Sequence, residues 1–375
     1  MITPADEFPV HQAPLPIAWP TTSDRNFYDR SYMCAHDRSG EIFVVIGVGY
    51  YPILGVKDAF VLVHRKDGDG ARHTVVRLSD AMDDDRLHQH VGPLAVDVVE
   101  PLAELRVTLA PTEGIAADLT WKGLFDVVQE QRHLMRQGSR VTLDAQRFAQ
   151  VGSWAGKLVV DDEEIAVDPS TWIGTRDRSW GIRPVGEPEP AGRPADPPFE
   201  GMWWLYVPMA FDDFAMVLII QEDPSGFRTL NDCTRVWSDG RVEQLGWPRV
   251  QIHYRSGTRL PTGATISATD SDGRPVTIEV DASAATPLHV GGGYGGDPDW
   301  GHGQWKGEGF VERVTYDLAD PAVAGRIPYG VIDHVGHAVC READGTQREG
   351  WGMFEHASFG LHRPSGFNDW GDVAP

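Results

Sequence analysis

The sequence predicts an all-β protein made of two β barrels or sandwiches with little helix. Its 375 residues include 41 glycines and 27 prolines, which long helices do not tolerate in their interiors. Short runs of β-branched and aromatic residues recur at the regular spacing that is typical of sandwiches and barrels. Asp-Gly pairs at 239–240, 272–273 and 344–345 stand between such runs, and these pairs favour tight hairpins.

The first half of the chain is proline-rich and then polar up to residue 40. A long strand is expected at 42–51, where β-branched and aromatic residues lead up to Pro52. Further strands, with a turn at 66–70, are expected at 59–64, 72–78, 94–99, 105–109, 117–121, 156–160 and 164–167. Apolar residues at 124, 125, 127, 128 and 134 fall on roughly one helical face, so we predict a short helix over 124–135.

The second half resumes the β pattern after a break rich in proline, glycine and acidic residues. Because proline-rich segments are extended and semi-rigid, we interpret residues 186–200 as a linker or long loop. It would separate an N-terminal β domain, 1–185, from a C-terminal β domain, 201–375. Strands are expected in the second domain at 202–209, 213–220, 227–237, 241–245, 250–254, 264–268, 276–280, 309–316, 329–341 and 349–359.

The charge balance limits the classes of partner. The chain has 33 basic and 55 acidic residues, a net charge of -22 that repels phosphate backbones and anionic lipid surfaces. We therefore expect no nucleic-acid partner. The longest apolar run, 214–220, is far too short to span a bilayer, so no membrane insertion is expected. No signal peptide is found, and Cys34, Cys233 and Cys340 are widely spaced, as expected for reduced thiols in the cytoplasm.

The sequence contains no motif for a common cofactor. A nucleophile elbow, a Walker loop and a Rossmann fingerprint are all missing, and the glycine run 291–296 is best interpreted as a flexible loop. His88 and His90 would share a strand face, but the acidic run beside them indicates a solvated loop. His334 and His337 would point to opposite faces of a strand. We predict that the protein uses no catalytic metal, flavin or nicotinamide.

The segment 174–184 has the composition of a functional site, Gly174-Thr175-Arg176-Asp177-Arg178-Ser179-Trp180-Gly181-Ile182-Arg183-Pro184. Each arginine keeps its charge and must reach water or an acceptor. One interpretation is a carboxylate, Asp177, held between arginines beside an aromatic wall and facing a cavity. The other is a structural Arg-Asp-Arg clasp that closes a sheet with Trp180 in the core. Both remain open, because structural ion-pair networks perturb carboxylates as active sites do.

Further candidate residues lie in segments that are expected to be inward-facing strand: Tyr206, Trp237, Tyr329, Asp333, Glu355 and His356. Trp203 and Trp204 are neighbours, so only one of them faces a barrel interior. Individually, such residues are more often core or rim than ligand contacts. Together they indicate an aromatic-lined cavity with few polar groups, which is the profile of an apolar small-molecule site.

Residues 147–184 resemble the carotenoid 1,2-hydratase (hydroxyneurosporene synthase) superfamily, which includes many uncharacterised actinobacterial and proteobacterial proteins. The resemblance rests on Arg147-Phe148-Ala149-Gln150-Val151-Gly152 and on Gly174-x-Arg176-Asp177-Arg178-Ser179-Trp180-Gly181-x-Arg183. It implies two lipocalin-like β barrels and, from relatives, cofactor-free cyclisation of polyenes at the barrel junction. The family motif is D-H-x-W-G, and its aspartate is proposed to protonate an alkene. Arg178 stands in place of the histidine, and a neighbouring cation would weaken Asp177 as a proton donor.

The first functional hypothesis is a cofactor-independent enzyme that acts on an apolar, terpenoid- or polyketide-like molecule by hydration or dehydration, isomerisation or cyclisation. Asp177 would be the acid or base. Arg176 and Arg183 would set its pKa or hold a substrate oxygen. Substrate-binding residues are expected to be Trp180, Trp203, Tyr206, Trp237, Tyr329 and Glu355. Trp180 and Trp203 would stack on a cationic or extended intermediate.

The alternative hypothesis is a lipocalin-like carrier of a hydrophobic ligand in which the arginine-aspartate cluster only locks the barrel. The position of Asp177 discriminates between the two. An Asp177 that lines a cavity supports the enzyme, and one sealed under strands with both oxygens held by arginines supports the carrier. Either way the expected partner is a hydrophobic small molecule, and monomer and homodimer remain open alternatives.

Overall fold

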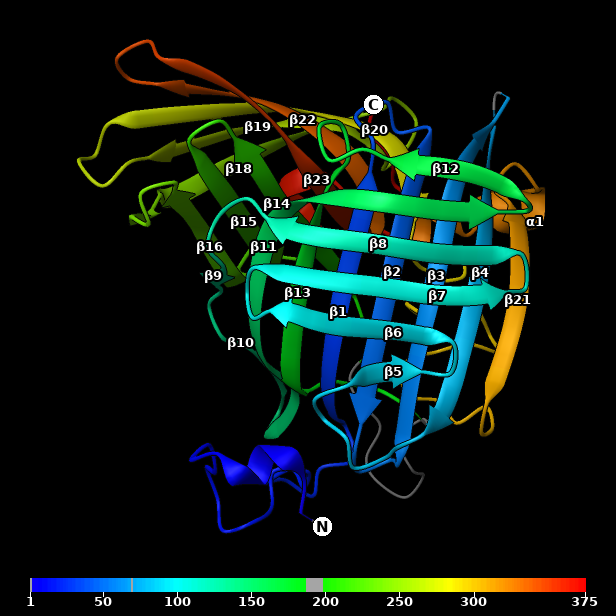
Figure 1. The fold of residues 1–375 in the computed structure, drawn as a ribbon. Coiled ribbons are helices and arrows are strands. Elements are labelled where there is room, and N and C mark those ends of the chain that lie inside the picture. The colour runs from blue at the N-terminus through cyan, green and yellow to red at the C-terminus, as the bar shows by residue number, and fades with distance from the viewer. Residues whose placement is uncertain (1, 69, 187–197) are drawn as a thin grey trace.

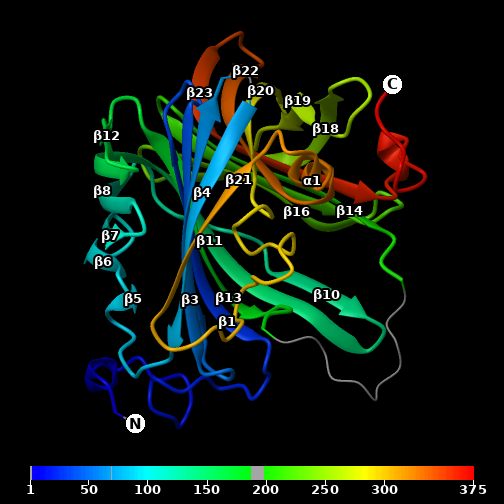
Figure 2. The ribbon, with the colours of Figure 1, turned by 90° about the vertical axis from the view of Figure 1, so that its right-hand side faces the viewer.

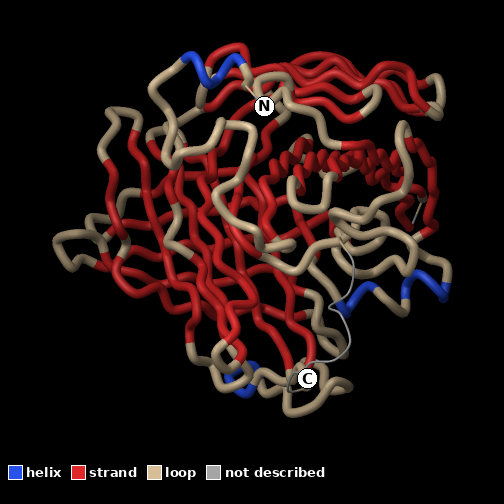
Figure 3. Tube along the Cα trace, turned by 90° about the horizontal axis from the view of Figure 1, so that it is seen from below, coloured by secondary structure: helices blue, strands red, loops and turns tan. Residues whose placement is uncertain are grey.

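The computed structural model describes residues 2–68, 70–186 and 198–375. In these segments the chain folds into two antiparallel sheets of 14 and 9 strands (Figure 1). Strand makes up nearly all of the regular structure (Figure 3). Helix is limited in the described segments to the short pieces η1 (Pro4–Glu7), α1 (Pro321–Ala324), η2 (Ile327–Tyr329) and η3 (Arg363–Ser365). The prediction of an all-β, two-barrel fold with little helix is confirmed.

The first sheet has the order β21-β4-β3-β2-β1-β13-β11-β8-β7-β6-β5, and β9, β10 and β12 also pair with β11. Its strands are β1 (Phe27–His36), β2 (Ile42–Tyr51), β3 (Val56–Asp67), β4 (Gly70–Ala81), β5 (Gln89–Val91), β6 (Leu94–Glu100), β7 (Glu104–Thr112), β8 (Ile115–Gly123), β9 (Val128–Gln129), β10 (His133–Gln137), β11 (Arg140–Val160), β12 (Glu163–Val167), β13 (Ile173–Ile182) and β21 (Phe310–Asp317).

The second sheet has the order β17-β16-β15-β14-β23-β22-β20-β19-β18. It curls around a buried core to which Leu205, Phe214 and Phe354 belong. Its strands are β14 (Gly201–Phe211), β15 (Phe214–Glu222), β16 (Arg228–Trp237), β17 (Val242–Gln244), β18 (Gly246–Tyr254), β19 (Pro261–Thr269), β20 (Pro275–Pro287), β22 (Ile332–Glu342) and β23 (Gln347–Gly360).

The long strand β11 divides the first sheet into two layers. Its residues 144–153 pair with β13, and its residues 152–160 pair with β8. Gly152 belongs to both pairings, and a Cβ there would lie 2.4 Å from the Trp121 ring, so only glycine fits. In Figure 1, β5 to β8 cross in front of β1 to β4. Trp121 and Trp154 pack edge to face between the layers, with ring centres 5.2 Å apart.

The second sheet packs against the other face of β1 to β4. Figure 2 shows β5 to β8 on one side of β3 and β4, and β14 and β16 on the other. One apolar cluster spans this junction, with Phe43 and Leu62 from the first sheet and Ile219 and Met353 from the second. Trp300, from the loop between β20 and β21, joins the same cluster. The junction between the two sheets is therefore a packed core. Any cavity within this core lies between the two sheets.

The chain returns to the first sheet late in the sequence, because β21 pairs with β4. The second half of the chain thus contributes a strand to the sheet built by the first half. The division into domains at 185 and 201 stays a prediction, and residues 187–197 of the expected linker lie outside the described residues.

Most expected strands and turns are found at the predicted places. The expected 42–51 strand is β2. Gly240, Gly273 and Gly345 have φ values of 83°, 79° and 89°, the left-handed conformation that turn glycines adopt at no steric cost. Among the described residues, no helix is both long and apolar enough to cross a membrane.

The helix predicted over 124–135 is wrong. This segment contains β9 and β10, which pair with residues 148–149 and 140–145 of β11. Where β8 ends at Gly123, β11 continues and offers a free edge. The backbone of the segment satisfies its hydrogen bonds on that edge, so long-range pairing overrides the local apolar spacing.

Candidate active site

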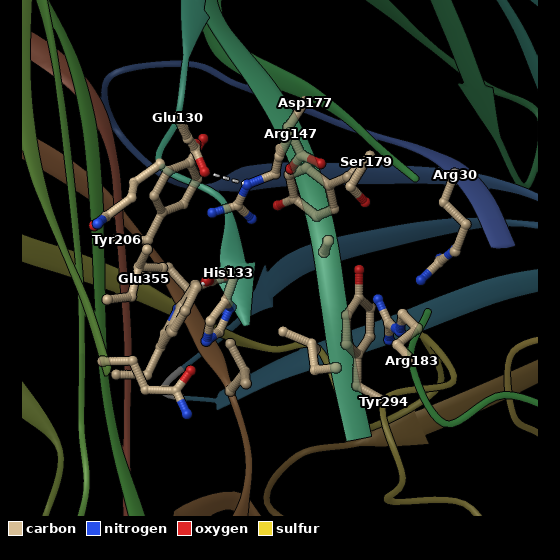
Figure 4. Close-up of a pocket in the computed structure, with 18 of the residues that line it drawn as sticks. Arg30, Glu130, His133, Arg147, Asp177, Ser179, Arg183, Tyr206, Tyr294 and Glu355 are labelled. Carbon is tan, nitrogen blue, oxygen red and sulfur yellow. Dashed lines mark hydrogen bonds and ion pairs between the residues drawn. The ribbon is translucent and has the colours of Figure 1, made fainter. Parts of the chain in front are cut away.

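A cavity of about 250 Å³ lies between the two sheets (Figure 4). One wall is formed by β1, β13 and β11, together with residues next to β9 and β10. The opposite wall is formed mainly by β14 and β23. Apolar side chains from both sheets line part of it: Leu143, Ala145, Met202, Leu230, Val331 and Met353. The cavity therefore has an apolar body to which polar groups are added at defined points.

The strand register explains which residues of the 174–184 motif reach this cavity. Ser179 lies between Arg30 on β1 and Arg147 on β11, and Asp177 lies two residues along the same strand face. All four residues line the cavity. Because side chains alternate along a strand, Arg176, Arg178 and Trp180 belong to the other face of β13. On that face, Arg176 lines a different cavity.

The Asp177 carboxylate is partly buried and makes no hydrogen bond or ion pair with any other residue that the structure describes. Burial raises its pKa, and the positive charges of Arg147, Arg30 and Arg183 oppose that rise. Arg178 does not act as expected from its place in the motif, because it pairs with Asp29 at 3.0 Å on the other face. Asp177 is thus an unpaired carboxyl group that faces the cavity.

Arg147 and Glu130 form an ion pair at one end of the cavity. The Arg147 Nε donates to Glu130 Oε2 at 2.5 Å. Its guanidinium lies 4.7 Å from the centre of the Tyr206 ring and 5.7 Å from that of Trp204, so it reaches across to β14. Burial raises the pKa of Glu130 to about 7, which Arg147 opposes. Burial also lowers the pKa of His133 to about 4, so this imidazole is neutral at pH 7.

The other end of the cavity is positively charged. Figure 4 shows Arg30, Arg183 and Tyr294 together there, away from Glu130 and Glu355. Arg30 is only 5% exposed, and its Nη1 donates to His302 Nδ1 at 2.7 Å. Burial lowers the pKa of His302, so the ring is neutral and accepts this bond. The Nη2 of Arg30 is buried without a partner among the described residues. This end is suited to an oxygen atom that carries or develops negative charge.

A pair of carboxyl groups belongs to the wall formed by the second sheet, where Glu355 lines the cavity and Asp333 is fully buried. Asp333 and Glu355 are directly opposite each other on β22 and β23. The Tyr32 hydroxyl donates to Asp333, and the Trp204 Nε1 donates to Glu355 Oε1 at 2.5 Å. Burial raises the pKa of Asp333 and of Glu355, and the charge of Glu355 raises that of Asp333 further. Burial of two adjacent carboxyl groups disfavours the doubly ionised pair, because like charges at close range repel.

Four of the nine predicted site residues line this cavity, namely Asp177, Arg183, Tyr206 and Glu355. Arg176 and Trp180 belong to the opposite face of β13, as described above. The other three lie elsewhere: Trp203 packs in the core of the second sheet, Trp237 lies at a polar groove beside Arg241, and Tyr329 is 55% exposed. The structure therefore does not bring these five residues into the cavity.

The sequence did not reveal the remaining polar lining. Arg30 lies in the stretch described as polar, and Glu130 and His133 lie in the segment predicted to be helical. Tyr294 lies in the glycine-rich segment that was expected to be a flexible loop, but Gly291, Gly292 and Gly293 are buried. Trp204 lines the cavity, whereas its neighbour Trp203, which was predicted to bind substrate, packs in the core of the second sheet.

The described residues contain no group of three or more His, Cys, Asp or Glu side chains arranged to hold a metal ion. His88 is exposed and binds Asp85, as the loop interpretation predicted. The three cysteines are free and buried. Whether the protein uses a cofactor stays a prediction from the sequence.

Comparison with known proteins places the chain in a family and in a fold. Residues 2–368 match a family model described as "Family of unknown function (DUF8625)". No curated protein matches the sequence. The structure is similar to that of a protein described as a "putative AttH" from Nitrosomonas europaea, with 11% identity and a TM-score of 0.51 over 93% of this chain and 98% of that one.

It is also similar to CghA, with 13% identity and a TM-score of 0.50 over 90% of this chain and 89% of that one. Kievitone hydratase from Nectria haematococca matches with 11% identity and a TM-score of 0.45, over 95% of this chain and 93% of that one. At these identities the likeness shows the fold alone. The resemblance to the carotenoid hydratase superfamily thus agrees with the fold, and its implications for activity stay predictions.

Proposed function

The chain belongs to DUF8625, a family of unknown function, and we propose that it is a cofactor-independent enzyme that acts on an apolar small molecule by general acid/base chemistry. The reaction would be a hydration or dehydration, an isomerisation or a cyclisation. The substrate would be terpenoid- or polyketide-like, with a largely apolar body and at least one polar oxygen. It would bind in the cavity between the two sheets.

The observation that carries this proposal is the state of Asp177. This carboxyl group lines the cavity without a hydrogen bond or ion pair from the described residues, and burial raises its pKa. A carboxylate in a structural clasp would instead be held by its arginines. Active sites raise the pKa of carboxyl groups by burial so that these groups can exchange protons near neutral pH.

The three arginines that line the cavity would favour removal of a proton from the substrate, because this step places negative charge on the substrate. In the proposed step, ionised Asp177 takes a proton from a carbon next to a substrate carbonyl. The electrons of the broken C–H bond form a C=C bond, and the carbonyl π electrons move to its oxygen. Arg30 and Arg183 would stabilise that oxyanion, because fixed cations in a water-poor site stabilise developing charge strongly.

The proton then returns at a different atom, and this choice defines the reaction. Return to another carbon gives an isomer. Delivery to a hydroxyl group on the β-carbon releases water, because the oxyanion re-forms the carbonyl, the C=C electrons form a new double bond to the β-carbon, and the C–O bond there breaks. Glu355 would supply a proton from the opposite wall, since burial raises its pKa. Tyr206 and Trp204 would stack on the apolar body, and Arg147 would orient both rings.

The carrier hypothesis required Asp177 to be sealed and held by arginines. The geometry favours the enzyme, because Asp177 is open to the cavity and its sequence neighbours Arg176 and Arg178 belong to the other face of the strand.

The test begins with the small molecules that solvent extraction releases from the purified protein, identified by mass spectrometry. Conversion of these compounds is measured with the wild type, with Asp177→Asn and with Asp29→Asn. Asp29 is an aspartate of the same sheet that pairs with Arg178 away from the cavity. We expect Asp177→Asn to lower turnover by roughly two to four orders of magnitude and Asp29→Asn to retain it. Full turnover in Asp177→Asn would contradict the proposal.

A further inference from the structure

A second cavity, of about 210 Å³, lies on the other face of β13, between the two layers of the first sheet. Figure 1 shows these layers, with β6 and β7 crossing in front of β1 and β13. Its apolar lining comes from four strands and one turn: Met33, Val96, Val98, Leu102, Leu105 and Phe148. Val98 and Leu102 are 43% and 51% exposed, so they form the rim. The cavity is thus a small apolar pocket that opens beside the β6–β7 turn.

Three charged residues of β13 line this pocket, namely Arg176, Asp177 and Arg178, and the most deeply buried of them is Arg176. It is 7% exposed, and its Nε donates to Gln150 Oε1 at 2.9 Å. Gln150 in turn donates to the carbonyl of Leu102 at 2.8 Å, which connects this arginine to the rim. The Arg176 Nη2 is buried and has no hydrogen-bond partner in the described part of the chain. No carboxylate among those residues pairs with this guanidinium.

The neighbouring Arg178 shows what a satisfied arginine looks like on the same strand face. Its Nη2 pairs with Asp29 at 3.0 Å, and its Nη1 donates to Gln89 Oε1 at 2.9 Å. Arg176 has only the ring of Phe148, 5.2 Å away, and the amide of Gln150. Arg176 is therefore more deeply buried than Arg178 and, unlike it, pairs with no anion among the described residues.

A buried cation without a counter-charge destabilises the folded state, because desolvation is not offset by attraction. Burial and the charge of Arg178 lower the pKa of Arg176 to about 10, and the charge of Asp177 opposes them. The Asp177 carboxylate lies across β13 and faces the first cavity. A ligand anion in the second cavity would supply the missing charge.

We propose that this second cavity binds an unbranched aliphatic monocarboxylate of the size of octanoate, with its carboxylate at Arg176 and its chain among the apolar residues of the pocket. Arginine recognises a carboxylate with charge-assisted hydrogen bonds. The volume is below the roughly 300–1,000 Å³ of sites for drug-sized ligands, so the chain is short. This site is separate from the proposed catalytic cavity and does not depend on its function.

The test uses octanoate as the probe, with octanol and acetate as controls, in calorimetric titrations of the full-length protein. Octanoate is expected to bind more tightly than octanol, which lacks the charge, and than acetate, which lacks the chain. Arg176→Gln should weaken octanoate binding by about tenfold to a hundredfold, the effect of losing a charge-assisted hydrogen bond. Arg183→Gln, in the other cavity, should leave it unchanged.

A second pair of variants tests the rim. Val98→Glu places a negative charge where the chain enters and should weaken octanoate binding. Val99→Glu is the matched control, because Val99 is 58% exposed and does not line the pocket. Each variant is first compared with the wild type by circular dichroism, and Val98→Glu tests the proposal even if Arg176→Gln does not fold. Absence of octanoate binding, or a loss in Arg183→Gln with none in Arg176→Gln, would overturn the proposal.

Discussion

Replacing Asp177 with asparagine should leave the free energy of unfolding nearly unchanged. The Asp177 carboxylate makes no ion pair with the described residues, so the substitution breaks no salt bridge there. Burial raises its pKa in the folded protein, which means that the ionised form is less favourable in the fold than in the unfolded chain. Asparagine has nearly the same shape and no charge. It therefore removes a destabilising ionisation and retains the packing.

The magnitude separates a cavity carboxylate from a structural clasp. Removing one partner of a buried ion pair costs about 3–5 kcal/mol, a large part of a typical stability of about 5–15 kcal/mol. For Asp177→Asn we expect a loss below about 1 kcal/mol, or a gain. Asp297→Asn is the matched control. Asp297 is 8% exposed, pairs with Arg77 at 2.8 Å and accepts from Gly291 N at 2.7 Å, so it is a true clasp and should show the large loss.

The effect of Asp177→Asn should also depend on pH with a definite sign. Below the ordinary pKa of 3.8, Asp177 is protonated in both states and the two proteins should be equally stable. As the pH rises above this value, the unfolded chain ionises first, and the wild type loses stability relative to the variant. The advantage of the variant is complete once the pH exceeds the raised pKa of the folded state.

Urea denaturation of the wild type, Asp177→Asn and Asp297→Asn at pH 4 and pH 7 measures both effects. Our account requires a small change for Asp177→Asn that becomes more favourable from pH 4 to pH 7. It is refuted if Asp177→Asn loses as much stability as Asp297→Asn, because Asp177 would then be a structural clasp. A variant that becomes less stable relative to the wild type as the pH rises would show that the pKa of Asp177 is lowered.

Two further predictions follow from the alternation of side chains and from burial. Trp204→Ala should weaken ligand binding with a small effect on folding, because Trp204 lines the cavity. Trp203→Ala should instead cost about 3–5 kcal/mol of stability, because Trp203 is 4% exposed in a core. Ligand titration and urea denaturation of both variants check this. Burial raises the pKa of Cys34 and of Cys340 to about 12 and also raises that of Cys233. All three thiols should therefore resist Ellman's reagent in the native protein and react in denaturant. Rapid labelling without denaturant would contradict this.

The fold class could be predicted from the sequence because its signals are local. Turn glycines such as Gly240 and Gly345 mark the hairpins, and runs such as 42–51 form strands whichever partners they find. The helix prediction for 124–135 was wrong for the opposite reason, because the signal that determines this segment is not local. Its structure depends on the free edge of β11, which no local pattern reveals.

The candidate site was predictable only in part. The 174–184 motif does contain Asp177 and Arg183, but its composition left a cavity carboxylate and a structural clasp equally open. If the motif is treated as a strand, whose side chains alternate between two faces, Asp177 and Arg176 are expected on opposite faces. Arg30, Glu130 and Tyr294 come from three distant segments, and only the packing of the sheets brings them together.

The central claim is that a proton moves between Asp177 and a bound substrate. The most direct measurement is deuterium incorporation into carbon when the compounds extracted from the protein are incubated with it in D2O and followed by NMR. The wild type is expected to introduce deuterium at a carbon next to a carbonyl. Asp177→Asn should bind the same compound and exchange it roughly two to four orders of magnitude more slowly. Equal binding by both proteins without exchange by either, or equal exchange by both, would contradict the claim.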